Sequence, residues 1–224
     1  MTPMGRLAIV TGTGTGIGKT HVSVALLLAL RSYFERVMGV KPVETGLNEA
    51  HLSDSAQLER ASSFHVQHSG YLFAEGVSPH LAAREAGERI DVRLVTDLVA
   101  NIRRQSDFTL VELAGGLFTP LSDFALNADL VAALEPDATL LITSDRLGVL
   151  HEVIAASRAA QAMNLPIDAV VLVAPERDDA STGRNVLELR RFVRAPFFAS
   201  VPRRSTETLA TDSTIRSIAE YLSR

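Results

Sequence analysis

The sequence predicts an α/β fold in which a mostly parallel β-sheet is flanked by helices on both faces. Short runs that are apolar on both faces alternate with helical segments, as in parallel sheets covered on both sides. A glycine-dense turn at residues 11–18 joins the first run to the first helix. The expected strands are residues 7–10, 37–43, 108–113, 139–143 and 169–174, and the clearest expected helices are residues 21–34, 92–104, 149–163 and 185–193.

Each element follows from its local pattern. The apolar run at residues 7–10 ends at the glycine-dense turn, and residues 21–34 carry apolar side chains on all faces, as a buried helix does. The second run, residues 37–43, is ended by Pro42 and Gly46. Residues 51–87 fit the alternation less well, so we expect helices and loops there, over one end of the sheet.

Composition bounds the classes of protein to which the chain can belong. Its 224 residues, 46% of them hydrophobic, predict a single domain over residues 1–224 with a sizeable core. A net charge of −4 argues against a nucleic-acid surface, which needs a basic stripe. The longest apolar run, residues 24–30, is too short to span a membrane, and the segment before the first turn is too short for a signal peptide.

The chain contains no cysteine, which excludes disulfides, thiolate metal sites and cysteine nucleophiles. Its six histidines form no pattern typical of zinc sites. A cytoplasmic location is therefore expected.

The glycine-dense turn has the context of a phosphate-binding loop, because it follows a strand and opens a helix. Its glycines let consecutive N–H groups face an anion, and the helix start adds partial positive charge. Lys19 would hold the β- and γ-phosphates, and the Thr20 hydroxyl would bind Mg²⁺. The spacing deviates from the standard loop, because Thr13 stands six positions before Lys19 and the opening glycine is Gly12. The sequence thus predicts a P-loop NTPase type of fold with a deviant phosphate loop.

Three further charged residues lie where strands are expected to end. Lys41 ends the second expected strand, Asp54 lies in the polar segment after it, and Glu112 closes an apolar run just before residues 114–116. Two carboxylates at one edge of a sheet can complete the oxygen shell of Mg²⁺, so Thr20, Asp54 and Glu112 are the candidate metal ligands. Taken alone, Asp54 would more often be a solvated surface acid, whereas an exposed edge lysine before a turn is the minor alternative for Lys41.

These motifs, in this order, resemble those of the dethiobiotin synthetases. The phosphate loop is similar to the one-residue-longer loop of that family, and Lys41 to Gly46 is similar to its Lys-Pro-Val-x-[Thr/Ser]-Gly segment, which leaves the position of Glu44 open. The segments 73–75, 78–80 and 111–121 and the pair Leu147-Gly148 before His151 follow in the family order. The resemblance covers residues 6 to about 151 well and the rest weakly.

The resemblance implies an ATP- and Mg²⁺-dependent ligase of biotin biosynthesis. Such an enzyme forms the ureido ring of dethiobiotin from 7,8-diaminopelargonic acid and CO₂ or bicarbonate. One amine captures CO₂ as a carbamate, which attacks the γ-phosphate of ATP to form a carbamic-phosphoric anhydride. The second amine then closes the ring. Repulsion between the two anions is the obstacle, and lysines and Mg²⁺ would neutralise it.

The resemblance also implies residue roles. Lys41 and Lys19 would be catalytic. The nucleotide and its metal would contact Gly12, Thr13, Gly14, Thr15, Gly16, Ile17, Gly18, Lys19, Thr20, His21, Asp54, Glu112, Leu113, Ala114 and Gly115, and the diamine would contact Thr15, Thr45, Gly116, Leu147, Gly148 and Val149. The last three residues would begin a helix at a homodimer interface and receive the carboxylate tail of substrate bound mainly to the partner.

Four positions depart from the family pattern. Gly14 replaces a common Asp, and Leu113 replaces a Gly and could crowd the nucleotide. Leu150 replaces an Asn near the tail-carboxylate site. Pro175 replaces an Asn that reads adenine, so weaker discrimination between nucleotide bases is expected. Arg203 and Arg204 either compensate through nucleotide contacts or form a solvated pair.

Three other functions fit parts of the sequence. A nucleotide-switch ATPase that dimerises with a protein partner shares a deviant phosphate loop, but usually has a second lysine where Thr13 and Gly14 stand. An amidotransferase-linked synthetase would need a catalytic cysteine. A degenerate homologue that only binds nucleotide is the third.

Overall fold

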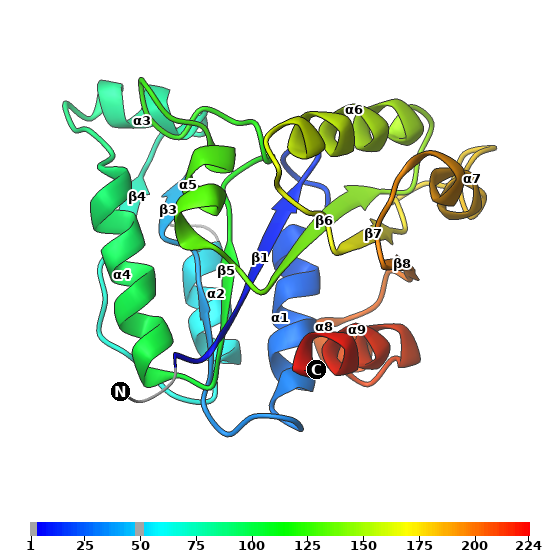
Figure 1. Cartoon of the computed structure of the whole chain (residues 1–224), viewed down its shortest axis with the longest axis horizontal. Helices are drawn as coiled ribbons and strands as arrows, with labels where there is room; N and C mark the ends of the chain where they lie inside the picture. The colour runs from blue at the N-terminus through cyan, green and yellow to red at the C-terminus, as the bar shows by residue number, and fades with distance from the viewer. Residues whose placement is uncertain (1–3, 48–51) are drawn as a thin grey trace.

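The computed structural model describes residues 4–47 and 52–224. Its main sheet has six parallel strands in the order β2-β5-β1-β6-β7-β8 (Figure 1). The strands are β1 (Arg6–Gly12), β2 (Val37–Val40), β5 (Phe108–Glu112), β6 (Ala138–Ser144), β7 (Ala169–Val173) and β8 (Phe197–Val201). The expected class, a mostly parallel sheet between helices, is confirmed.

Two apolar clusters cover the two faces of this sheet. On one face pack α1 (Lys19–Leu30), α2 (Asp54–Ala61), α8 (Thr206–Ala210) and α9 (Ser213–Ser223). On the other pack α3 (Pro79–Glu85), α4 (Val92–Gln105), α5 (Asn127–Leu134), α6 (Val149–Ala162) and α7 (Asn185–Phe192). Strands β1, β5 and β7 have side chains buried on both faces, which explains their nearly continuous apolar sequences. None of the described helices is long and apolar enough to cross a membrane.

The second expected strand is shorter than residues 37–43. The ladder of β2 ends at Val40, because Pro42 has no N–H group to donate to a neighbouring strand. The chain then enters a separate two-stranded parallel sheet of β3 (Val43–Thr45) and β4 (Tyr71–Phe73). This break lets Lys41 lie between the two sheets.

Other boundaries also differ from the expectation. The first helix spans α1 rather than residues 21–34, because residues 31–33 form a turn. The poorly patterned segment contains α2, β4 and α3, while its first residue, His51, lies outside the described residues. Helix α5 and strand β8 are not among the elements expected from the sequence. Strand β8 lies at the edge of the sheet, and its side chains are only partly buried.

We expect Leu141→Ala to lower the free energy of unfolding by about 3 kcal/mol, because Leu141 is fully buried in β6 and its truncation leaves a cavity. The matched control is Leu187→Ala on α7, where the side chain is 65% exposed, and its effect should stay within about 0.5 kcal/mol. Urea unfolding of both variants measures the difference. Equal losses would contradict the assignment of β6 to the core.

Candidate functional site

The phosphate loop connects the end of β1 to the start of α1. Gly16 and Gly18 adopt φ angles of 72° and 96°, the left-handed region in which a side chain is strained. The ammonium of Lys19 donates a hydrogen bond of 2.7 Å to the carbonyl oxygen of Gly14, so the lysine folds back over the loop. Gly116 packs against this loop, because a Cβ there would come within 2.8 Å of the Gly12 carbonyl oxygen.

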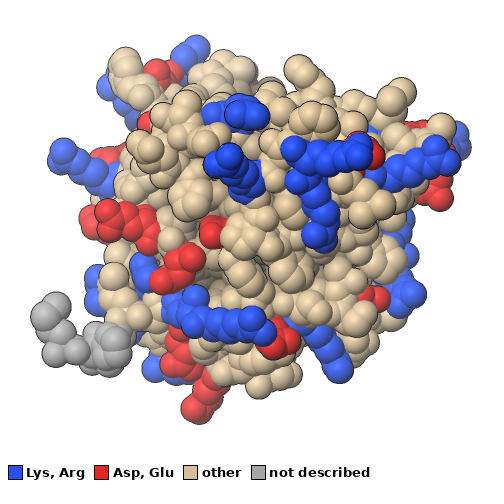
Figure 2. All heavy atoms as spheres, turned by 45° about the vertical axis from the view of Figure 1, so that its right-hand side comes forward, with Lys and Arg blue, Asp and Glu red and all other residues tan. Residues whose placement is uncertain are grey.

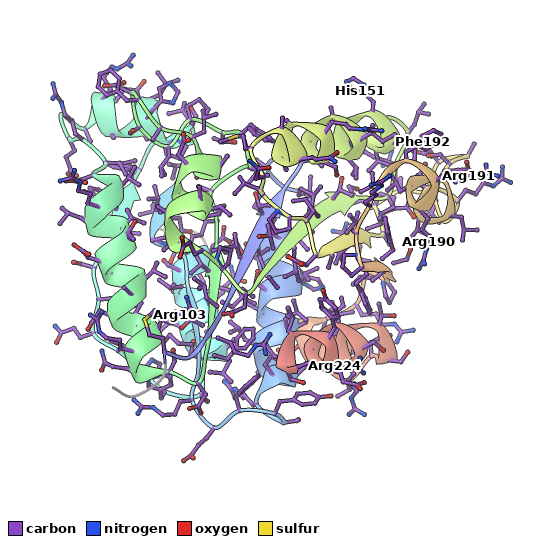
Figure 3. The ribbon with its side chains drawn as sticks, in the orientation of Figure 1. Arg103, His151, Arg190, Arg191, Phe192 and Arg224 are labelled. Carbon is purple, nitrogen blue, oxygen red and sulfur yellow. The ribbon has the colours of Figure 1, made fainter. Side chains whose placement is uncertain are left out.

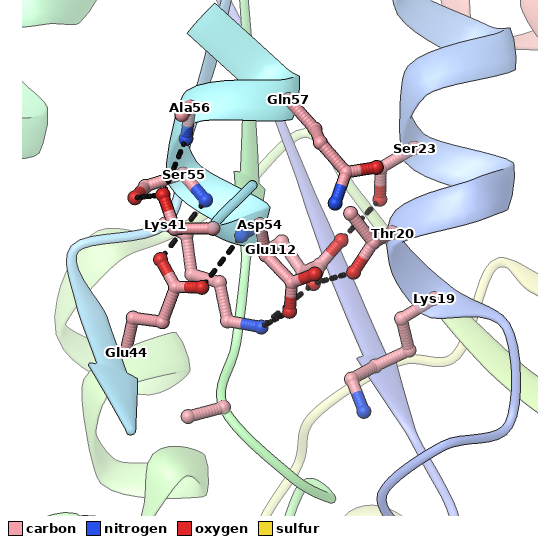
Figure 4. A network of polar contacts seen from close by, with 12 residues as sticks. Lys19, Thr20, Ser23, Lys41, Glu44, Asp54, Ser55, Ala56, Gln57 and Glu112 are labelled. Atoms are coloured by element: carbon pink, nitrogen blue, oxygen red, sulfur yellow. Dashed lines mark hydrogen bonds and ion pairs between the residues drawn. The ribbon is translucent and has the colours of Figure 1, made fainter. Parts of the chain in front are cut away.

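Glu112 is the centre of a polar network beneath the loop (Figure 4). Its side chain is completely buried at the carboxyl end of β5. The carboxylate accepts hydrogen bonds from Thr20 Oγ1 at 2.8 Å, Ser23 Oγ at 2.8 Å and Lys41 Nζ at 3.0 Å. Ser23 is not among the site residues expected from the sequence, although a lone hydroxyl one turn after Thr20 in an apolar helix was the available signal.

Lys41 lies between two carboxylates. Its ammonium forms ion pairs with Glu112 and with Asp54, and only 8% of the side chain is exposed. Burial by itself lowers the pKa of Lys41, but the nearby charges of Glu112 and Asp54 outweigh it and raise the pKa above its ordinary value. The expectation that Lys41 faces the phosphate loop at the end of β2 agrees with this position, and a solvated edge lysine does not.

Lys19 has the opposite electrostatic setting. Burial lowers its pKa from 10.5 to about 8, and Glu112 offsets this only in part while the charge of Lys41 adds to it. The side chain is 6% exposed. The site therefore contains one lysine whose charge is compensated and one whose charge is not.

Asp54 is the first residue of α2, and its carboxylate contacts Lys41. Its backbone N–H donates to the carboxylate of Glu44, a buried side chain on β3. Glu44 is not among the site residues expected from the sequence, because a single acid in a three-residue strand has no distinctive pattern.

These residues line a cavity of about 350 Å³. The lining residues are Thr15, Gly16, Gly18, Lys19, Thr20, His21, Lys41, Thr45, Asp54, Glu112, Ala114 and Gly115. Twelve residues expected from the sequence thus meet in one place, although they come from segments spread over about a hundred positions. Leu113 does not line this cavity: it is 2% exposed, and its side chain packs in the core.

A second cavity of about 560 Å³ lies beside the first and shares Gly16, Gly18 and His21 with it. Its far wall contains Pro175, Glu176, Arg203 and Arg204. The two arginines are ion-paired, with Glu176 at 2.8 Å and with Asp212 at 3.3 Å respectively. Figure 2 shows acidic and basic side chains together on the face turned toward the viewer, around a broad uncharged centre.

The expected tail-carboxylate segment lies at the start of α6. The helix begins at Val149, directly after Gly148, and Leu147 is 76% exposed. The N–H of Leu147 already donates to the carboxylate of Asp179 at 2.7 Å. Hydrogen bonds from the Ser181 hydroxyl and from this N–H lower the pKa of Asp179 to about 2. Leu147, Gly148 and Val149 line neither of the two cavities described above.

The phosphate loop is nevertheless linked to α6. The Thr13 hydroxyl lies 2.9 Å from the Thr143 hydroxyl and donates to the Glu152 carboxylate at 3.1 Å. The Thr13 hydroxyl is therefore engaged with β6 and α6, and Thr13 lines neither of the two cavities. Figure 3 shows His151 on the outer side of α6, where it is exposed.

The residues present fit a nucleotide with its divalent cation. Thr20, Asp54 and Glu112 supply oxygen atoms around one cavity wall, which is the donor set that Mg²⁺ prefers. The Nε2 atom of His21 is buried and has no hydrogen-bond partner among the described residues, although His21 lines both cavities. No cluster of three or more His, Cys, Asp or Glu residues able to hold a metal occurs in the described part of the chain.

Solved structures of similar shape establish the fold class. The septum site-determining protein MinD from Pyrococcus horikoshii, complexed with Mg-ADP, covers 98% of this chain with 95% of its own at a TM-score of 0.59 and 16% identity. A ParA family ATPase from Chlorobium tepidum gives a TM-score of 0.59 at 16% identity, with 97% of this chain and 98% of its own covered. At such low identity these likenesses concern the fold alone.

Proteins with similar sequences identify the family of this chain, which the solved structures do not. A family model described as an AAA domain matches residues 6–209. The ATP-dependent dethiobiotin synthetase BioD of Nitrosospira multiformis is 33% identical over 202 residues, 89% of each chain. This chain is also similar to the ATP-dependent dethiobiotin synthetase BioD of Ralstonia nicotianae (36% identity, 87% of each chain). It is similar as well to BioD 1 of Escherichia coli K12 (32% identity, 89% of this chain and 91% of the relative). With the ordered motifs gathered around one phosphate-loop cavity, these similarities show that the chain belongs to the family of ATP-dependent dethiobiotin synthetases.

Proposed function

We propose that this chain is an ATP-dependent cyclo-ligase that forms the ureido ring of dethiobiotin from 7,8-diaminopelargonic acid and CO₂ in biotin biosynthesis. The observation that carries the proposal is the meeting of the phosphate loop, Lys41 and the buried carboxylate of Glu112 in one cavity. Family membership supports the same reaction. The cysteine-free composition and the need for ATP support a cytoplasmic location.

The chemistry requires two anions to react. An amine of the substrate adds to CO₂ and loses a proton, giving a carbamate. A carbamate oxygen attacks the γ-phosphorus, and the bond to ADP breaks. The second amine then attacks the carbamate carbon, releases phosphate and closes the ring. The chain contributes positive charge and alignment, with Lys41 facing the carbamate and Lys19 facing the phosphates.

Thr20, Asp54 and Glu112 are proposed to hold Mg²⁺, which would neutralise phosphate charge when bound. In the structure, Lys41 bridges the two carboxylates of this set, so the site is electrically compensated before a metal enters. Thr45, which lines the same cavity, is proposed to contact the diamine, as is Thr15.

The larger cavity is proposed to receive the ribose and base of the nucleotide, because it continues from the phosphate loop. Pro175 on its wall has no side-chain hydrogen-bonding group to read a base. Arg203 and Arg204 line the same cavity, and their acidic partners hold them in place.

A homodimer is proposed, with the start of α6 at the interface. The exposed side chain of Leu147 and the exposed His151 on the outer side of the helix support this, since both leave an unpartnered surface near the helix N-terminus. Substrate held by one protomer would extend its carboxylate to Gly148 and Val149 of the other. At Leu147 that carboxylate would have to displace Asp179.

The reaction itself is tested with the purified protein, ATP, Mg²⁺ and bicarbonate, with and without 7,8-diaminopelargonic acid. Phosphate release should depend on the diamine, and the product should have the mass of dethiobiotin. Phosphate release at the same rate with and without the diamine would instead favour a nucleotide-switch ATPase.

Substitution separates the proposed roles of the two lysines. Lys41→Ala should lower turnover at least about 100-fold and leave nucleotide binding within about threefold, because the lost charge faces the carbamate. Lys19→Ala should lower turnover and also weaken nucleotide binding. Steady-state kinetics and calorimetric titration with nucleotide measure these effects, and circular dichroism checks the fold of each variant. Turnover by the Lys41→Ala variant at the wild-type rate would refute the proposed role of Lys41 in facing the carbamate.

Pro175 predicts weak base selectivity. ATP and CTP should support turnover within about tenfold of each other, a difference of ~1.4 kcal/mol. Pro175→Asn adds a donor and an acceptor to the same cavity wall and should widen the gap in favour of one base. Comparing kcat/KM for the two nucleotides in both proteins measures the effect. A strict requirement for ATP in the parent would mean that another group reads the base.

A further inference from the structure

Glu44 is a buried acid that the proposed reaction does not use. It lies in the middle of β3, three residues after Lys41, and only 4% of its surface is exposed. A carboxylate is costly to bury unless strong donors compensate it. Its donors therefore indicate why it is there.

Both oxygens of Glu44 bind the start of α2 (Figure 4). Oε1 accepts from the N–H of Asp54 at 2.6 Å, and Oε2 accepts from the N–H of Ser55 at 3.0 Å. These are the first two residues of the helix, whose N–H groups have no partner within it. The Ser53 hydroxyl caps the same turn separately by accepting from Ala56 N–H at 3.2 Å.

The contact to Asp54 closes a ring of interactions. Glu44 follows Lys41 by three residues in the chain, and its carboxylate accepts a hydrogen bond from the backbone N–H of Asp54. The carboxylate of Asp54 in turn forms an ion pair with Lys41. The Asp54 side chain is itself 36% exposed, so burial does little to hold it in place. Its position depends on how the first turn of α2 is anchored.

We propose that Glu44 is a positioning residue, which anchors the first turn of α2 and thereby places the Asp54 carboxylate against Lys41 and at the Mg²⁺ site. The inference rests on the proposed function for its link to the metal and to turnover. The placement of Asp54 against Lys41 can be measured independently of that function. The Lys-Pro-Val-x-[Thr/Ser]-Gly pattern leaves this position open, so the assignment concerns this chain's own residue.

The composition of the chain allows a direct readout. Its sequence contains two lysines, Lys19 and Lys41, so protein labelled with carbon-13 at the lysine ε-carbon gives two side-chain signals by NMR. The Lys41→Arg variant assigns them. Glu44→Ala should move the Lys41 signal and leave that of Lys19 in place. Glu44→Gln, which keeps one carbonyl acceptor, should give a smaller shift in the same direction and protects the test if the alanine variant folds poorly.

Ser53→Ala is the matched control, because it removes a different cap from the same turn. Both Ser53→Ala and Glu44→Ala should lower the midpoint of chemical unfolding. Only the substitution of Glu44 should move the Lys41 signal. An unmoved Lys41 signal in both Glu44 variants would overturn the proposal and leave Glu44 as an ordinary helix cap.

Kinetics test the link to turnover. Glu44→Ala should lower kcat about tenfold with little change in KM for ATP, whereas Ser53→Ala should stay within about twofold. In an Asp54→Asn background, Glu44→Ala should cost less than about twofold more, because its effect passes through Asp54. If the loss of kcat in the double variant equals the product of the losses in the two single variants, the proposal is overturned. If wild-type protein shows no diamine-dependent turnover, the proposed function fails, while the lysine spectra still decide where Glu44 places Asp54.

Discussion

The buried carboxylate of Glu112 is the group on which the geometry of the site depends. It is fully enclosed, so it must be compensated by donors, and removing one partner of such a group costs about 3–5 kcal/mol in typical proteins. Its donors are Thr20 and Ser23 on α1 and Lys41 after β2. One charge therefore ties together the helix behind the phosphate loop, the end of β5 and the catalytic lysine proposed here.

The sheet order brings these groups together. Strands β2, β5 and β1 are neighbours in the parallel sheet, so their carboxyl ends lie side by side and present Lys41, Glu112 and the phosphate loop to one cavity. The break at Pro42 adds the small β3–β4 sheet, from which Glu44 reaches the start of α2. Asp54 thus enters the site from a third direction, through a helix anchored by a strand.

Lys41 and Lys19 have different electrostatic environments in the site. Two carboxylates compensate Lys41, which keeps its charge, while burial leaves Lys19 with a pKa of about 8. An uncompensated cation in a phosphate loop is stabilised when anionic phosphates bind, which suits a reaction between two anions. Lys19 and Lys41 are the only two lysines in the sequence, and all the other residues counted in its Lys+Arg total of 22 are arginines.

The sequence by itself determined the fold class and most candidate ligands, because hydrophobic periodicity and the strand-loop-helix context of Lys19 and Thr20 are local properties of the chain. Glu112 was recognisable as an acid that ends an apolar strand. Only the tertiary structure decided that Ser23 and Glu44 belong to the site and that Leu113 points into the core. Such contacts depend on which strands become neighbours: Ser23 and Glu112 are 89 positions apart, and no local pattern records that they meet.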